Sequence, residues 1–181
     1  QPPAEAPAAA EAPVEEQAAA PEELIFLFMH ALLEAGDHVV CTFPGYQSLY
    51  EVARSIGCRV SRWEPEEESE WRFDIDKLKD LITEDTRLLG VNFPHDPTGH
   101  LPARGDYLAL RDLVQERGIS LLSDEMYRFL ELEDGSRLPP ACELYPHAFT
   151  LCGLSKSFGL PGLRTGWMVS REGQILDRMA G

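Results

Sequence analysis

A regular alternation of short apolar runs with helical apolar stripes, from Val39 to Ser170, most limits what this 181-residue chain can fold into. Six runs have the length and composition of buried strands. Between them, apolar residues recur at the three- and four-residue spacing of one helix face, as in 49–56, 75–82 and 107–114. Strands alternating with helices predict a mostly parallel sheet with helices on both faces, a three-layer α/β/α fold. The six runs are 39–43, 58–63, 87–93, 119–123, 148–154 and 166–170.

The first twenty residues differ sharply from the rest. Residues 1–20 are Ala, Pro, Glu and Gln with a single valine and no aromatic residue, which predicts a disordered tail or linker. At Pro21 the composition changes: a proline followed by two glutamates is typical of a helix start. We therefore divide the chain into a tail, 1–20, and one incomplete globular unit, 21–181.

Composition and charge exclude several classes of function. The net charge of −15 argues against nucleic acid or an anionic membrane as a partner. No apolar run reaches membrane-spanning length and no basic-then-apolar leader precedes Pro21, so we expect a cytoplasmic protein. The four cysteines lack metal-ligand spacing and lie in or beside apolar runs. We interpret them as reduced core thiols and expect no metal site.

Several predicted strands end in residues that can carry chemistry, and ligands of parallel sheets bind at these carboxyl ends. Tyr46 follows the first strand, Asp96 the third, and Asp124 and Tyr127 the fourth. Read alone, each has an ordinary structural explanation: a core or hairpin tyrosine, an Asp-Pro turn, a surface acid, a rim tyrosine. An acid directly after a buried strand is nevertheless costly to bury unless it meets a cation, which makes Asp124 a candidate binding residue.

The segment 153–166, GLSKSFGLPGLRTG, follows the fifth strand and holds a lysine and an arginine eight positions apart. Lys156 has small or apolar neighbours in sequence, and a nucleophilic amine requires partial desolvation so that its neutral form is accessible. Arg164 suits an anion, of which phosphate is the common one. The alternative is a strand-to-loop corner with a solvated lysine and arginine.

This segment resembles the lysine loop of the class I/II aminotransferases, which are fold-type I pyridoxal-phosphate enzymes. The resemblance implies that Lys156 forms the Schiff base with the cofactor and that Arg164 holds its phosphate. It also implies that Asp124 pairs with the protonated pyridine nitrogen, that Tyr127 donates to the phenolic oxygen, and that Tyr46 stacks on the ring.

One turn departs from the family pattern. The stretch 92–99, NFPHDPTG, is similar to the family turn N-x-P-x-N-P-T-G, but Asp96 stands where the family has the asparagine that hydrogen-bonds the phenolic oxygen. A carboxylate there should raise the apparent pKa of the Schiff base; alternatively, Asp96 is itself protonated.

Three further departures lie around the expected phosphate site and after the arginine. Where the family has a phosphate turn, typically Thr-x-Gly, this chain has alanines at 18–20, and Gly153 stands where relatives often carry a phosphate-binding hydroxyl. Thr165 replaces the usual aliphatic residue. Relatives are also much longer, with a preceding strand and a C-terminal small domain that carries the arginine for the substrate carboxylate. We therefore expect weak cofactor binding, little or no transamination by this chain, and a sheet edge at 166–170 that is unpaired or covered by the tail.

The resemblance implies a function, with alternatives that the residues leave open. We expect a pyridoxal-phosphate-binding, aminotransferase-like protein acting on an amino acid and 2-oxo acid pair through Lys156, and forming a homodimer. A lyase or decarboxylase with the same cofactor is the second interpretation. A non-catalytic remnant or binding module that keeps the fold is the third.

Overall fold

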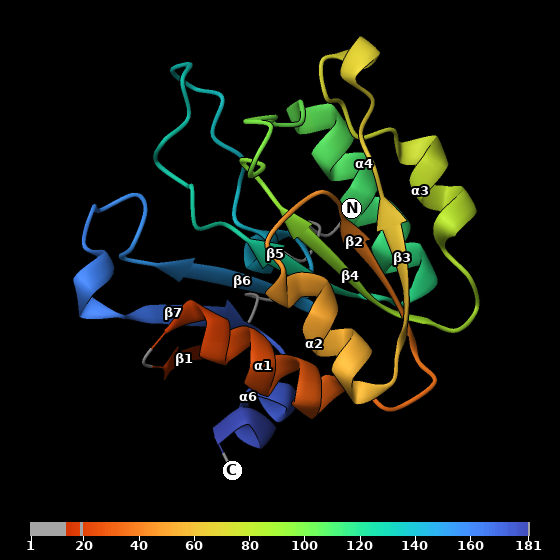
Figure 1. Ribbon diagram of the computed structural model, residues 1–181, viewed down its shortest axis with the longest axis vertical. Helices are drawn as coiled ribbons and strands as arrows, with labels where there is room; N and C mark the ends of the chain where they lie inside the picture. Colours follow the sequence, from red (N-terminus) through yellow and green to blue (C-terminus); the bar gives the residue numbers. More distant parts are fainter. Residues whose placement is uncertain (1–13, 19, 181) are drawn as a thin grey trace, which may run out of the picture.

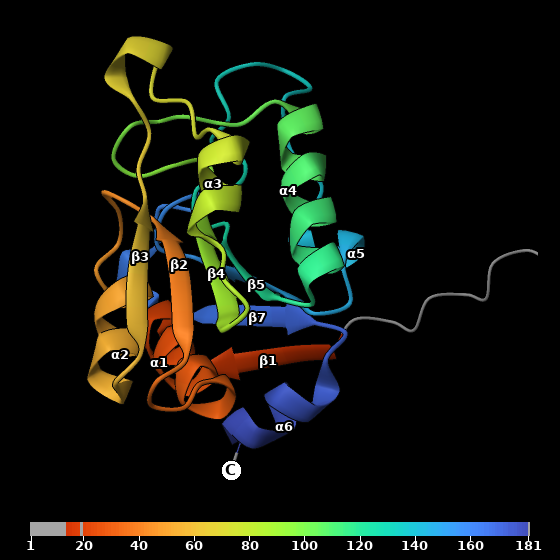
Figure 2. The ribbon, with the colours of Figure 1, turned by 90° about the vertical axis from the view of Figure 1, so that its right-hand side faces the viewer.

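A seven-stranded sheet with helices on both faces forms the body of the protein (Figures 1 and 2). The computed structural model describes residues 14–18 and 20–180. The strand order is β1-β7-β6-β5-β4-β2-β3; β6, β5, β4, β2 and β3 are parallel to one another, and β1 and β7 are antiparallel to their neighbours. The predicted α/β fold with a mostly parallel sheet is confirmed. The strands are β1 (Val14–Ala18), β2 (His38–Thr42), β3 (Arg59–Trp63), β4 (Thr86–Asn92), β5 (Ser120–Asp124), β6 (Ala148–Gly153) and β7 (Gly166–Ser170).

Successive residues of the central strands face opposite layers, as the pleat of a strand requires. Leu88 and Leu122 face one core, with α1, α2 and α6, whereas Leu89 and Leu121 face the other, with α3, α4 and α5. Both faces of the sheet are therefore buried, which explains the near-continuous apolar character of these strands. The helices are α1 (Pro21–Leu32), α2 (Ser48–Ile56), α3 (Ile75–Leu81), α4 (Arg104–Arg117), α5 (Ala141–Leu144) and α6 (Gly173–Ala180), with short 3₁₀ helices at Glu67–Ser69 and Pro161–Leu163.

Local sequence signals explain several helix ends. Asp74 accepts a hydrogen bond from the N–H of Asp76 at 2.8 Å and caps α3, as its position predicted. α2 ends at Gly57 and α4 at Gly118, with φ of 100° and 64°, a conformation that glycine adopts without steric cost. The predicted stops after these two helices are confirmed.

The prediction of a disordered tail is wrong for residues 14–18, which form β1. This strand pairs antiparallel with β7, from Val14 opposite Ser170 to Ala18 opposite Gly166, and so covers the edge that we expected to be open or covered by the tail. No apolar pattern marks β1, because an edge strand is held by backbone N–H and C=O groups, which do not require apolar side chains. Residues 1–13 and 19 lie outside the described part of the chain.

The cysteines and the lengths of the helices can also be compared with the sequence predictions. All four cysteines are free thiols, and Cys41, Cys58 and Cys142 are buried, as predicted. Within residues 14–18 and 20–180, no helix combines the length and apolar character needed to cross a bilayer.

Candidate active site

A pocket of about 240 Å³ opens at the carboxyl ends of β4, β5 and β6. All the residues predicted for the site from sequence line this one pocket, although one of them ends β5 and the others come from four different connections: β2–α2, β4–α4, β5–α5 and β6–β7. The pocket also includes residues that sequence reasoning did not select, among them Glu22 and Asn92. The predicted residues that line it are Tyr46, Asp96, Asp124, Tyr127, Lys156 and Arg164.

Asp124 is the most buried acid of the pocket. It is the last residue of β5 and is 4% exposed, and its Oδ1 accepts a hydrogen bond from the N–H of Met126 at 3.1 Å. Burial raises the pKa of this carboxyl to about 7; the charges of Glu125 and Asp96 act in the same direction, and Lys156 opposes them. A cationic group bound beside Asp124 would stabilise its ionised form.

A chain of hydrogen bonds joins the ends of β4 and β5 to the rim of the pocket. Asn92 donates from Nδ2 to the carbonyl of Asp124 at 3.0 Å, and its Oδ1 accepts from the N–H of Asp96 at 2.7 Å. The hydroxyl of Tyr127 donates to Oδ2 of Asp96 at 2.7 Å. Asn92 therefore positions both the acid at the pocket base and the turn that carries Asp96. Its side chain could have been selected from sequence, since it is the first residue of the 92–99 turn.

Lys156 differs from its expected setting. We expected a partly desolvated amine, but the side chain is exposed, with Nζ 5.2 Å from the centre of the Tyr127 ring. The neighbouring Tyr127 hydroxyl raises the pKa of Lys156, and the charges of Asp96 and Asp124 add to the effect, whereas burial opposes it. The amine is therefore held as an ammonium ion, because the pocket is open and lined with acids.

Arg164 follows the 3₁₀ helix Pro161–Leu163 in an unusual backbone conformation. Its φ of 50° lies in the left-handed region, which residues other than glycine seldom adopt outside turns and functional sites. The side chain is exposed, and among the described residues its hydrogen bond goes to the carbonyl of Pro161, at 3.5 Å. This guanidinium is accessible to an anion in the pocket.

A close contact explains why residue 153 is glycine. Gly153 and Gly166 lie opposite each other on β6 and β7, and the ring of Pro21 rests on both. A Cβ at Gly153 would lie 2.8 Å from Cγ of Pro21 and 3.1 Å from the sulfur of Met126, and a Cβ at Gly166 only 2.6 Å from Cγ of Pro21. A hydroxyl side chain, which the family resemblance implies at this position and which this chain lacks, would therefore have no room beside this proline.

Tyr46 and Glu22 line another part of the pocket, and Ser48 lies behind Glu22. The hydroxyl of Ser48 donates to a carboxylate oxygen of Glu22 at 3.0 Å. Tyr46 is 42% exposed, and its pKa is raised by partial burial and then by the charge of Glu22. Tyr46 lines the pocket as predicted, but its stacking on a ring stays a prediction. Glu22 was noted from sequence only as an acid at a helix start.

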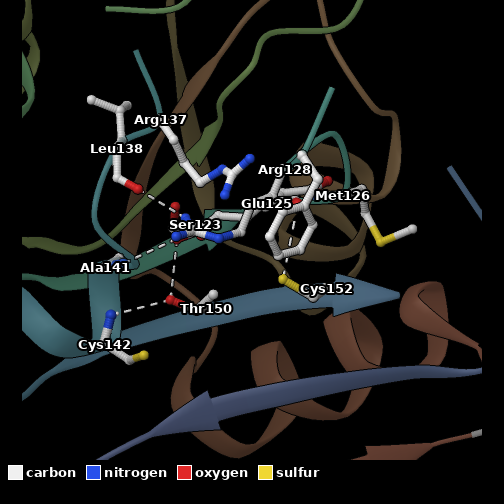
Figure 3. Close-up of polar contacts among 12 residues, drawn as sticks. Ser123, Glu125, Met126, Arg128, Arg137, Leu138, Ala141, Cys142, Thr150 and Cys152 are labelled. Atoms are coloured by element: carbon white, nitrogen blue, oxygen red, sulfur yellow. Dashed lines mark hydrogen bonds and ion pairs between the residues drawn. The ribbon is translucent and has the colours of Figure 1, made fainter. Parts of the chain in front are cut away.

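Beneath the pocket, a buried network holds the segment that follows β5 (Figure 3). Oε1 of Glu125 accepts hydrogen bonds from the N–H of Ala141 at 3.0 Å and from the hydroxyl of Thr150 at 3.2 Å. Oε2 pairs with Nη1 of Arg128 at 3.0 Å, and the same Nη1 donates to the carbonyl of Leu138 at 2.9 Å. Glu125, which follows Asp124 in the chain, thereby connects the end of β5 to β6 and α5.

We expect Glu125→Ala to lower the free energy of unfolding by about 3 kcal/mol, the scale for breaking one side of a buried ion pair. The change leaves Arg128, the Ala141 N–H and the Thr150 hydroxyl without this acceptor. Urea unfolding followed by circular dichroism measures the loss. Glu143→Ala, at an exposed position of α5, is the matched control. A loss no larger than that of the control would contradict the bracing role.

Comparison with known proteins agrees with this arrangement. The family model for aminotransferase class I and II matches residues 21–181. Capreomycidine synthase of Streptomyces vinaceus is 35% identical over 81% of this chain and 38% of its own length. Arginine–pyruvate transaminase of Pseudomonas aeruginosa is 33% identical over 80% of this chain and 37% of its own.

A solved structure gives the same result. A PLP-dependent aminotransferase of Streptococcus suis superposes with a TM-score of 0.85 at 33% identity, covering 92% of this chain and 43% of that protein. The chain thus spans less than half the length of the relatives it matches. It belongs to the aminotransferase class I and II family, and that membership implies pyridoxal 5′-phosphate as its cofactor.

Proposed function

We propose that this chain binds pyridoxal phosphate and acts in amino-group transfer between an amino acid and a 2-oxo acid, with Lys156 as the residue of covalent attachment. The observation that supports this most is the convergence of Lys156, Asp124, Tyr127 and Arg164 on one pocket. An amine, a buried acid, a phenol and an accessible guanidinium match the aldehyde, ring nitrogen, phenolic oxygen and phosphate of this cofactor in kind.

The fit can be tested against the donor set of the pocket. Asp124 is buried, and a pyridinium nitrogen beside it would supply the charge partner that a buried carboxylate requires. Tyr127 offers a hydroxyl, although it donates to Asp96 in this structure. The amine and ring contacts therefore fit the cofactor. The phosphate contacts fit less well, since Arg164 shares the pocket with the acid Glu22.

The residues of the chain would have distinct tasks in the reaction. When bound, the cofactor supplies an electron sink for negative charge at the α-carbon of an amino acid. Asp124 would keep the ring nitrogen protonated, and Lys156, once neutral, would accept the α-proton at Nζ. Tyr127 and Asp96 would share the proton next to the phenolic oxygen.

A decarboxylase or other lyase is the second candidate, favoured by the similarity to the threonine-phosphate decarboxylase of Salmonella typhimurium, which is 31% identical over 75% of this chain. The two chemistries differ in product. Incubation of the chain with pyridoxal phosphate and single amino acids, followed by separate assays for 2-oxo acid and for carbon dioxide, distinguishes them. Formation of 2-oxo acid supports the proposal, and release of carbon dioxide supports the alternative. Cofactor binding without either product agrees both with the low transamination expected of this chain and with a non-catalytic binding module.

We further propose that the protein is a homodimer. Large apolar side chains are exposed on two neighbouring loops, where the rings of Phe129 and Phe158 lie 6.1 Å apart and Leu132 and Leu163 face solvent. Exposed apolar groups gathered in this way favour association. Sedimentation equilibrium tests the proposal, and a mass of one chain at all concentrations would contradict it.

The pKa of Lys156 predicts a pH dependence of cofactor attachment. Only the neutral amine reacts with an aldehyde, so attachment should increase as the pH rises. Tyr127→Phe removes the largest cause of the raised pKa. The ammonium form then loses stabilisation, and the midpoint of attachment should move to lower pH. Attachment rates measured by absorbance between about pH 8 and about pH 12, a range that extends above the ordinary lysine pKa, test this.

The control for this experiment is Tyr50→Phe, on α2 and outside the pocket. It should leave the midpoint unchanged. A midpoint in Tyr127→Phe that is unchanged or moves to higher pH would contradict the assigned cause.

A further inference from the structure

Glu22 is an acid in the pocket that the proposed chemistry does not use. It lies in the first turn of α1, and its carboxylate accepts the hydroxyl of Ser48 at 3.0 Å. Ser48 is buried in the first turn of α2, so this hydrogen bond links the starts of two helices and restrains the carboxylate. Glu22 itself is exposed, and the hydrogen bond from the buried Ser48 is what holds its carboxylate at the pocket.

The start of α1 offers few free backbone donors to an anion, the ligand that a helix N-terminus commonly binds. Pro21 has no N–H, and the N–H groups of Glu23 and Leu24 donate to the carbonyl of Ala20 at 3.0 and 3.3 Å. Pro21 in turn occupies the space above Gly153, so that no larger side chain fits there. The paired backbone N–H groups, the lack of side-chain space at Gly153 and the negative charge of Glu22 therefore all disfavour an anion at this end of the pocket.

The charges that line the pocket leave one base for a phosphate. The acids are Glu22, Asp96 and Asp124, and the bases are Lys156 and Arg164; because burial keeps Asp124 partly protonated near pH 7, the ionised acids and the bases nearly balance. Lys156 has the aldehyde as its partner under the proposed function, which leaves Arg164 for a phosphate. A phosphate dianion entering this pocket is attracted by one guanidinium and repelled by the Glu22 carboxylate.

We propose that Glu22 is a specificity-determining residue that disfavours the phosphate group of the ligand, so that the pocket distinguishes less between phosphorylated and unphosphorylated pyridoxal compounds than Arg164 alone would. This inference rests on the proposed cofactor class. The charge of the Glu22 carboxylate is the property that the test removes. Glu22→Gln keeps the size of the side chain and its capacity to accept the hydrogen bond from Ser48.

The test uses ligands that cannot react with Lys156. 4′-Deoxypyridoxine lacks the aldehyde, and it is compared with its 5′-phosphate by isothermal titration calorimetry at constant ionic strength. We expect Glu22→Gln to bind the phosphate ester roughly tenfold more tightly than the unaltered chain, and the unphosphorylated compound with equal affinity. The gain should shrink at high salt, because screening weakens the repulsion.

Glu23→Gln is the matched control, since it removes the same charge from the same helix turn at an exposed position that does not line the pocket. It should leave both affinities unchanged, which separates a pocket effect from the helix dipole. The proposal is overturned if Glu22→Gln binds the phosphate ester no more tightly, if both ligands gain equally, or if neither binds to either protein.

These outcomes are distinct from failure of the proposed function. That failure would appear as absence of covalent attachment of pyridoxal phosphate to Lys156. The phosphate selectivity of Glu22→Gln could still be observed in that case, because the deoxy ligands do not require the amine.

Discussion

Lys156→Ala is expected to abolish covalent attachment of pyridoxal phosphate to this chain. The chain has three lysines, Lys77, Lys79 and Lys156, and only Lys156 lines the pocket. Its amine lies beside Tyr127 and Asp124, whereas the other two are on α3, on the opposite side of the sheet from α1. Incubation with the cofactor, reduction with borohydride and mass spectrometry of the intact chain measure the adduct.

Two matched substitutions make this result specific. Lys77 and Lys79 pair with Glu66 and Asp76 at the surface, so Lys77→Ala and Lys79→Ala should retain the adduct at the level of the unaltered chain. Peptide mapping should locate the reduced adduct on Lys156. An undiminished adduct in the Lys156→Ala protein would remove the basis of the proposed function.

Asp124→Asn is expected to stabilise the chain without cofactor above neutral pH and to flatten the dependence of its stability on pH. Burial raises the pKa of Asp124 from 3.8 to about 7. A shift of this size corresponds to about 4 kcal/mol at about 1.4 kcal/mol per unit. The unaltered chain should lose up to roughly this amount of unfolding free energy between about pH 4 and pH 7 through this group. Urea unfolding at several pH values measures it.

The direction follows from the protons bound in each state. Between pH 4 and 7 the folded chain holds a proton on Asp124 that the unfolded chain has released, so stability falls as the pH rises through this window. Asparagine has no proton to lose and abolishes this contribution. Asp80→Asn, at an exposed site on α3, is the control, and its unfolding free energy should depend on pH as that of the unaltered chain does. Equal slopes for the Asp124→Asn protein and the unaltered chain would contradict the prediction.

The same substitution should have the opposite effect on cofactor binding. A bound pyridinium would stabilise the Asp124 carboxylate, so the unaltered chain should gain more stability from added pyridoxal phosphate than Asp124→Asn does. Attachment through Lys156 should persist in Asp124→Asn, with weaker affinity.

The core strands and their order along the chain could be predicted from sequence because both faces of a parallel sheet are buried. Gly166–Ser170 was predicted with the bounds of β7, and the other strands differ by about a residue at their ends. β1 could not be predicted in this way, because its pairing with β7 needs only backbone groups. The short α5 was also missed, since its four residues are too few to show a helical period.

Sequence by itself determined the chemical groups of the candidate site and their common location. Asp96, Asp124 and Lys156 each follow an apolar run, and the carboxyl ends of parallel strands meet at one edge of the sheet. Only the tertiary structure decided the environment of each group, because burial and charge depend on neighbours distant in sequence. It buries Asp124, leaves Lys156 exposed among acids, and sets Pro21 on Gly153. It also brings the Glu22 carboxylate, restrained by Ser48, into the pocket that holds Lys156 and Arg164, a contact that no local pattern could predict.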